Sequence, residues 1–244
     1  MRDVRARLDW AHRRMEQFNA AVDTFLSTNP YFMSADFECK SEPYYVATHR
    51  YRFRVRAPAA VPIDLRLAAG ELVHSFRSAI DNIIWTIGKK FKASSRLALE
   101  FKNGPDHFAK YTTSAKLSKL PLPLQHWIEA QQLYKRKDGQ RSILHDLTIL
   151  WNEDKHRLPM LAGHAVQCVT IGSRGSVEAV SVGYLVPLND GDEVVTVTNA
   201  VDFEPEFAFG VAFTAIAKEA KTFFQDAERH IAEEVIPTFE PYLT

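Results

Sequence analysis

The chain has 244 residues, of which 46% are hydrophobic and 25% are charged, so a packed core is expected and disorder is not. Lysine plus arginine and aspartate plus glutamate both number 30, which excludes a protein that coats nucleic acid or anionic membranes through bulk charge. Two cysteines, Cys39 and Cys168, exclude a disulfide framework, and no run approaches the roughly 20 apolar residues of a membrane helix. Since no apolar signal core follows the first methionine, we expect a cytoplasmic protein that does not contact membranes.

A long helix is predicted over residues 4–25, because apolar side chains recur there at alternating spacings of four and three. Pro30 cannot continue this helix. The stripe packs on the core of its own chain or forms the seam of a homodimer through helical faces, and we prefer the first interpretation. Its members are Val4, Leu8, Ala11, Met15, Phe18, Val22 and Phe25.

Residues 45–56 alternate like a strand with two different faces. One face is aromatic and apolar, and the other carries four arginines that could receive the phosphate backbone of RNA. Alternatively, the arginines form a solvated face that pairs with acidic residues of a neighbouring strand. Because the chain has no net charge, we prefer the second interpretation. These arginines are Arg50, Arg52, Arg54 and Arg56.

Helical patterns continue through the middle of the chain. A second helix is predicted over residues 65–88, ended by glycine and two lysines. Residues 89–125 are expected to be irregular, since glycine and proline recur there. Two further helices are predicted over residues 125–135 and 142–156.

After residue 163 the pattern becomes one of strands, with period-two alternation and many valines, threonines and phenylalanines. Hairpin turns separate the segments, so we expect an antiparallel β-meander, to which the arginine strand can add. A final helix is predicted over residues 216–239. The expected strands cover residues 164–172, 176–187, 193–199 and 206–214.

The predicted fold class is α+β. A helical core, made of the long N-terminal helix and two or three central helices, packs with the meander and the C-terminal helix. We expect a single domain over residues 1–244. Within it, residues 1–160 are mainly helical with one arginine-rich strand, and residues 164–244 hold the meander and the last helix.

A polar line runs beside the apolar stripe of the second helix. His74, Arg77, Asp81 and Trp85 share one face of that helix. Burying such charged groups is costly unless they are paired, and Arg77 and Asp81 can pair at i and i+4.

A matching polar segment ends the helix predicted over residues 142–156. Its last turn holds Lys155, His156 and Arg157, where the helix dipole favours cations. The dipole does not explain Asn152, a poor helix former on the face of His156. We therefore expect the Arg77 side of one helix to meet the His156 side of the other across a gap that water can reach.

The segments “VHSFRSAIDNIIW” and “LWNEDKHRL” together resemble a group of uncharacterised bacterial proteins. That group carries an L-R-x-A-L-D-x-x-x-W helix and a later N-x-D-K-H-R segment, and the resemblance spans roughly the first two thirds of the chain. Phe76 and Ile80 stand where the group has leucine. The resemblance implies a shared site and no particular reaction.

A looser similarity is to the HEPN class of helical ribonucleases and toxins, which use R-x(4–6)-H, often at a dimer interface. The forms here are Arg141-x3-His145 and Asn152-x3-His156, which differ in spacing. The similarity implies metal-independent cleavage of RNA, or nucleotide binding, in a protein of a toxin or phage-defence type, with no cofactor.

In that interpretation the polar residues have distinct roles. His156 takes the 2′-hydroxyl proton, Arg77 or Lys155 stabilises charge on the phosphate, and Asn152 orients the histidine or the substrate. Two alternatives remain open: the residues bind a ligand or partner without catalysis, or they form a buried ion-pair network that locks the helices together. The remaining binding candidates are His74, Asp81, Asp154, Arg157 and the four arginines of the strand.

Overall fold

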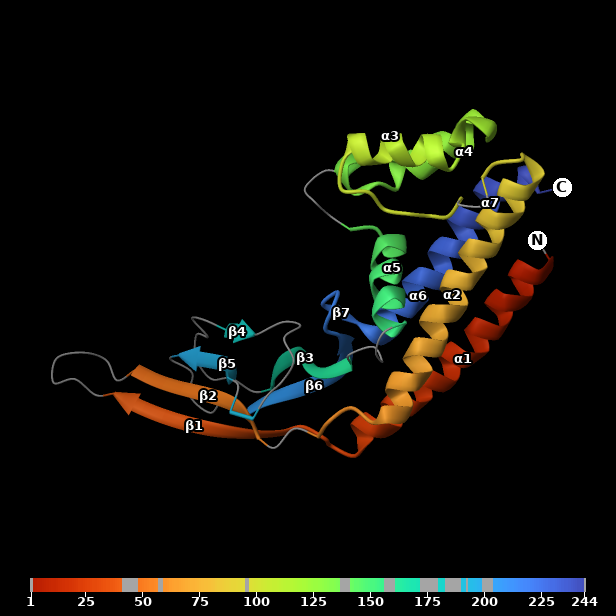
Figure 1. Cartoon of the computed structure of the whole chain (residues 1–244). Helices are drawn as coiled ribbons and strands as arrows, with labels where there is room; N and C mark the ends of the chain where they lie inside the picture. The colour runs from red at the N-terminus through yellow and green to blue at the C-terminus, as the bar shows by residue number, and fades with distance from the viewer. Residues whose placement is uncertain are drawn as a thin grey trace. The chain divides into compact units, whose positions relative to one another are not determined.

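The computed structural model of the chain confirms the α+β class, with helices and antiparallel strands (Figure 1). It describes residues 2–40, 48–56, 59–94, 97–136, 141–155, 161–171, 180–182, 190–191, 193–198 and 204–243. The chain divides into two compact units. Unit 1 comprises Met1–Gln17, Leu67–Pro159 and Lys221–Thr244, and unit 2 comprises Phe18–Arg66 and Met160–Ala220. The single-domain organisation stays a prediction.

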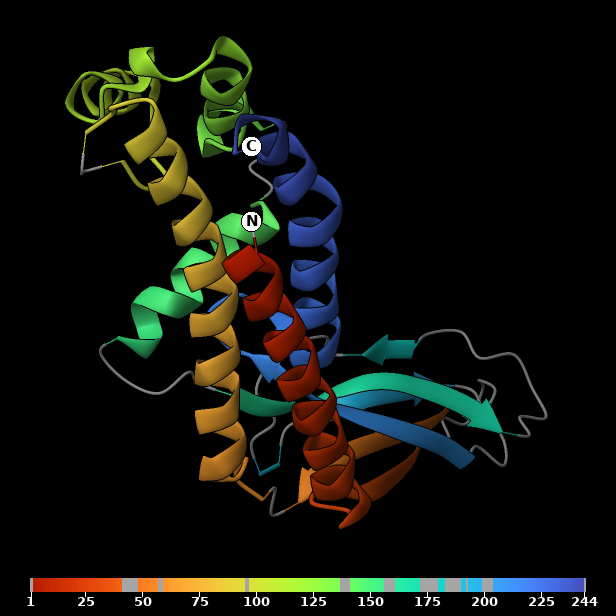
Figure 2. The same cartoon turned by 90° about the vertical axis from the view of Figure 1, so that its right-hand side faces the viewer.

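Unit 1 is built around three helices that run alongside one another, as two views show (Figures 1 and 2). They are α1 (Arg2–Ser27), α2 (Ile63–Lys90) and α6 (Ala220–His230), each taken over its residues in unit 1. The Phe76 and Phe224 rings stack between α2 and α6 with centroids 6.1 Å apart. Burying each such side chain stabilises the fold by about 1.5–3 kcal/mol. The predicted stripes are confirmed within unit 1, because their members there are buried. These are Val4, Leu8, Ala11 and Met15 of the first stripe and Leu72, Phe76, Ile80, Ile83, Ile84 and Ile87 of the second.

Between α2 and α6 the described residues form five short helical segments. The expectation of irregular structure over residues 89–125 was wrong in part, because α3 begins at Pro105. A proline in the first helical turn lacks only an N–H that has no intrahelical partner there. Ser142, predicted as the first residue of the helix over residues 142–156, is instead the N-cap of α5 and accepts a hydrogen bond from the amide of His145. The segments are α3 (Pro105–Ser114), η1 (Leu117–Lys119), α4 (Leu122–Ala130), η2 (Leu133–Lys135) and α5 (Ile143–Asp154).

The C-terminal helix differs from the single helix predicted over residues 216–239. Ala217 adopts a φ of 52° and β7 (Lys218–Glu219) follows, so helix begins only at residue 220. After α6 come a π-helical turn, η4 (Ile231–Val235), then α7 (Ile236–Phe239) and η5 (Glu240–Tyr242). Pro237 accounts for the interruption, because a proline ring clashes with the carbonyl four residues earlier in a regular helix.

The described residues of unit 2 form two antiparallel sheets. One has the order β1-β2-β5-β4 and the other the order β3-β6-β7. The arginine strand β2 pairs with β1 and β5, which confirms that it joins the later strands. The simple meander was wrong, because β3 pairs with β6 across the intervening strands, and β1 was not predicted at all. The strands are β1 (Phe32–Lys40), β2 (Thr48–Arg56), β3 (Leu161–Ile171), β4 (Val180–Val182), β5 (Glu193–Thr198) and β6 (Glu204–Phe213).

Tyr31 anchors the aromatic core of unit 2. Its ring centroid lies 6.1 Å from that of Phe25 and 5.2 Å from that of Phe209, and burial raises the pKa of its hydroxyl to about 12. A Cβ added to Gly163 would lie 2.0 Å from the Tyr31 hydroxyl, so β3 needs a residue without a side chain there. Among the described helices, none is long and apolar enough to cross a membrane.

Candidate functional site

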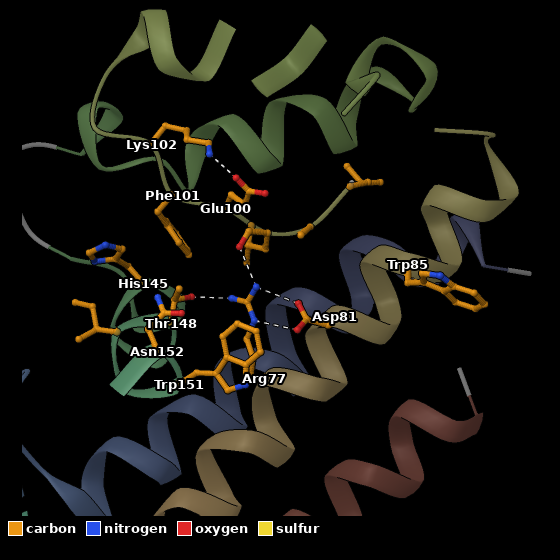
Figure 3. Close-up of a pocket in the computed structure, with 14 residues that line it drawn as sticks. Arg77, Asp81, Trp85, Glu100, Phe101, Lys102, His145, Thr148, Trp151 and Asn152 are labelled. Carbon is orange, nitrogen blue, oxygen red and sulfur yellow. Dashed lines mark hydrogen bonds and ion pairs between the residues drawn. The ribbon is translucent and has the colours of Figure 1, made fainter. Parts of the chain in front are cut away.

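Arg77 joins α2, α5 and the segment of residues 97–102 in unit 1 (Figure 3). Its Nε donates to Asp81 Oδ2 at 3.2 Å, its Nη1 to Thr148 Oγ1 at 2.7 Å, and its Nη2 to the Leu99 carbonyl at 3.0 Å. The side chain is only 4% exposed, and its Cζ lies 5.1 Å from the centroid of the Trp151 ring. The Arg77 face of α2 therefore meets α5, and the predicted pairing with Asp81 is present.

The segment of residues 97–102 has no regular secondary structure, and side chains supply several of its hydrogen bonds. Gln132 is fully buried; its Nε2 donates to the Glu100 carbonyl at 3.0 Å, and its Oε1 accepts from the Lys102 amide at 2.8 Å. The Tyr111 hydroxyl donates to the Ala98 carbonyl. Together with Arg77, these contacts hold the segment of residues 97–102 in place, and we call this segment the wall.

A cavity of about 520 Å³ lies between this wall, α2 and α5, and we call it the aromatic pocket. Its aromatic lining residues are Trp85, Phe101 and Trp151. Its polar lining residues are Arg77, Asp81, Glu100, Lys102, His145, Thr148 and Asn152. Of the predicted site residues, the structure thus brings Arg77, Asp81 and Asn152 to one cavity.

The charged groups of the aromatic pocket are paired. The Arg77 Nη2 lies 3.0 Å from Asp81 Oδ1, and the Lys102 ammonium pairs with the Glu100 carboxylate. Burial lowers the pKa of His145, whose ring meets the Phe101 ring edge to face with centroids 4.9 Å apart. The imidazole is therefore neutral at pH 7, and hydrogen-bond recognition is favoured over charge.

The end of α5 carries the remaining predicted residues. Asn152 and Lys155 are exposed, and the Lys155 Nζ lies 3.0 Å from the centroid of the Trp151 ring. Burial raises the pKa of Asp154, while the nearby His74 opposes that rise. His74 is exposed and its Nε2 lies 3.3 Å from the Ser78 hydroxyl. His156 and Arg157 lie outside the described residues, so their predicted roles stay predictions.

The arginines of β2 belong to unit 2, and two of them stand opposite acidic residues of β1 in the strand register. The strand register places Glu38 opposite Arg50 and Asp36 opposite Arg52. Arg54 Nε lies 3.4 Å from Asp36 Oδ2, an ion-pair distance without hydrogen-bond geometry, and Arg56 Nε donates to the Ser34 hydroxyl at 3.0 Å. The Arg54 contact supports the interpretation in which the arginines pair with acidic residues of a neighbouring strand, whereas the side chains of Arg50 and Arg52 lie outside those that the structure describes.

Sequence reasoning missed part of the pocket. Thr148 lies one turn before Asn152 on α5, so the spacing of four residues could have indicated it. Glu100, Phe101 and Lys102 carry no such signal, because their segment is irregular and contacts α2 only after the chain has folded.

No group of three or more histidine, cysteine, aspartate or glutamate side chains suited to a metal ion occurs among the described residues. Comparison of the chain with protein-family models, with curated proteins and with solved structures found no match.

Proposed function

We propose that the aromatic pocket binds a nucleotide, either free or as an unpaired unit of RNA. The observation that carries the proposal is the combination of aromatic and neutral hydrogen-bonding side chains around one cavity of about 520 Å³. Pockets for small ligands typically have volumes of about 300–1,000 Å³. Aromatic rings stack on bases, and amide and imidazole groups hydrogen-bond base edges.

Trp85 and Phe101 are the stacking surfaces. Two cations, Arg77 and Lys155, already lie over the Trp151 ring, with 5.1 Å and 3.0 Å to its centroid. The Trp85 side chain is 59% exposed, and the Lys89 Nζ lies 5.2 Å from its ring centroid. Because the Trp85 ring is exposed, a base can stack on it without disturbing the buried core.

Calorimetric titration of the four nucleoside monophosphates and a short single-stranded RNA tests the proposal. Trp85→Ala is expected to weaken binding by about 5- to 150-fold, the value of one stacking contact. Trp10→Ala is the matched control, because Trp10 is also exposed, also lies under a basic side chain (Arg14), and lies outside the pocket lining. Absence of binding to wild type, or equal losses in both variants, would refute the proposal.

A second function, cleavage of RNA without a metal ion, is favoured by the exposed end of α5. Asn152 lines the aromatic pocket, Lys155 lies one turn after Trp151, and His156 follows directly in the chain. In this proposal His156 removes the 2′-hydroxyl proton, the 2′-oxygen bonds to phosphorus, and the P–O5′ bond breaks to leave a 2′,3′-cyclic phosphate. The departing 5′-oxygen takes a proton from water, and Lys155 stabilises charge on the phosphate. Arg77 then positions α5 and the wall, since its donors already bind Asp81, Thr148 and Leu99.

Cleavage of a single-stranded RNA is measured with excess EDTA. His156→Ala is expected to abolish the reaction and Lys155→Ala to slow it by about 100-fold or more, while circular dichroism stays unchanged. His126→Ala, which changes an exposed histidine of α4, is the control. Activity that persists in His156→Ala, or that EDTA removes, would contradict this second function.

A further inference from the structure

We infer that the aromatic pocket recognises an uncharged planar heterocycle, so that a nucleotide would bind by its base while its phosphate stays outside. The inference rests on the proposed function and names the part of the ligand that the pocket takes. It follows from the balance of charge around the cavity and from the kind of groups that remain for a ligand.

The formal charges in the pocket lining cancel. Arg77 is neutralised by Asp81, with Nη2 3.0 Å from Oδ1, and Lys102 is neutralised by Glu100. Arg77 cannot turn towards a phosphate without losing its hydrogen bonds to Thr148 and Leu99 in a buried place. Separating this ion pair would leave the buried Arg77 guanidinium without its compensating charge, which is costly.

The uncharged groups suit the edge of a heterocycle. Burial lowers the pKa of His145, so its neutral ring can offer either a donor or an acceptor at Nε2, while Nδ1 is buried. The Asn152 amide is exposed at the same cavity and also offers both kinds of group. Phe101 and Trp85 each provide a flat apolar surface, Phe101 beside His145 and Trp85 on the other side of Asp81 (Figure 3). A base stacked on one of these rings offers both donors and acceptors, whereas a phosphate offers only acceptors.

Calorimetry with a nucleoside, its monophosphate, its triphosphate and inorganic triphosphate tests the inference. The nucleoside is expected to bind within about twofold of its monophosphate, with little effect of salt, and inorganic triphosphate is expected not to bind. An affinity that rises about tenfold or more with added phosphates and falls steeply with salt would overturn it. In that case nucleotide binding itself still stands; failure of every nucleoside, nucleotide and RNA to bind removes both.

Two oligonucleotides distinguish the source of the base. A short single-stranded RNA that outcompetes the nucleoside, and that loses this advantage when its central base is removed, identifies RNA as the source. An RNA no tighter than the nucleoside identifies a free base or nucleoside. Equal binding of the intact and abasic strands, tighter than that of the nucleoside, would contradict recognition of a base.

Glu100→Gln provides an independent measurement on the full chain. Removing this carboxylate releases Lys102 from its pair, so the preference for the monophosphate over the nucleoside is expected to rise by about tenfold. Glu129→Gln is the matched control, since Glu129 pairs with Lys135 at 2.8 Å outside the pocket lining. No change in preference with Glu100→Gln would overturn the charge argument.

Discussion

Arg77 shows how one long side chain can organise a site. A guanidinium group offers five donors in a fixed plane, and here its three nitrogens donate to three different parts of unit 1. A lysine would keep the charge and lose this geometry. The pairing with Asp81 could be predicted from the spacing of four residues, whereas Thr148 and the Leu99 carbonyl could not, since they lie 71 and 22 residues away in the chain.

Arg77→Met tests this role. The substitution keeps an unbranched stem but leaves Asp81, Thr148 and the Leu99 carbonyl without their donor, so a loss of about 2–4 kcal/mol in the free energy of unfolding is expected. Arg14→Met is the control, because Arg14 pairs with Glu71 on the surface, where such pairs contribute about 0–1 kcal/mol. Urea denaturation measures both. Equal losses would mean that the buried contacts of Arg77 do not stabilise unit 1.

His145 gives the stability a defined dependence on pH. Burial lowers its folded pKa below the ordinary value of 6.5, so the unfolded chain takes up the proton first as the pH falls. Stability is therefore lost below pH 6.5, down to the lowered folded pKa, and it is unaffected above pH 6.5. In urea denaturation, His145→Gln is expected to gain stability relative to wild type as the pH falls through that window.

The pKa of His12 is shifted in the opposite direction to that of His145. A hydrogen bond to Glu228, helped by the charges of Glu228, Glu16 and Asp9, raises its pKa. Its contribution is fully present below pH 6.5 and is lost as the pH rises through the raised folded pKa. His12→Gln should therefore lose stability relative to wild type at low pH. If both histidine variants changed in the same direction, the pKa assignments would be wrong.

At the scale of elements, the hydrogen bonds of Gln132 hold the wall of the aromatic pocket in place. Gln132→Leu keeps the bulk and removes the bonds to the Glu100 carbonyl and the Lys102 amide, so a loss of about 2–3 kcal/mol is expected. Hydrogen exchange of the Lys102 amide should accelerate. Gln125→Leu, which removes a single bond to the Leu120 carbonyl, should cost about 1 kcal/mol and leave that amide protected. An unchanged Lys102 amide would refute the role of Gln132.

The elements that the sequence did not predict each have a physical reason. In β1, Ser34, Asp36 and Glu38 alternate with apolar residues, so a period-two signal was present. The strand that pairs with this segment, the arginine strand β2, is known only from the folded structure. In α3, Pro105 suggested a break although a proline in the first turn begins a helix. Local sequence patterns therefore predicted the long helices well and the strand pairings poorly.

The residues of the aromatic pocket could likewise be predicted only in part. Helical spacing alone brought Arg77, Asp81 and Asn152 into one hypothesis, because residues on one face of a helix are determined by period. The wall of residues 97–102 could not be predicted, since its position depends on the buried amide of Gln132 and on the hydroxyl of Tyr111. Contacts of this kind are visible only once distant segments are brought together.

At the scale of the whole molecule, Gly163→Ala tests whether the two units unfold separately. The added methyl would collide with Tyr31, so a loss of about 1–3 kcal/mol is expected, confined to unit 2. Hydrogen exchange should accelerate in β3 and β6 and stay unchanged in α2. Gly104→Ala is the control, since nothing lies within 4 Å of its added Cβ. Equal acceleration in α2 would show that the chain unfolds as one cooperative domain.

The interleaving of the two units has a consequence for biosynthesis. Unit 2 needs Met160–Ala220 and unit 1 needs Lys221–Thr244, so neither can close while only the first half of the chain has left the ribosome. At a synthesis rate of about 5–20 residues per second, the apolar stripes of α1 and α2 therefore stay without their later packing partners for several seconds or more. We expect a chaperone that recognises apolar segments to contact these two stripes during translation.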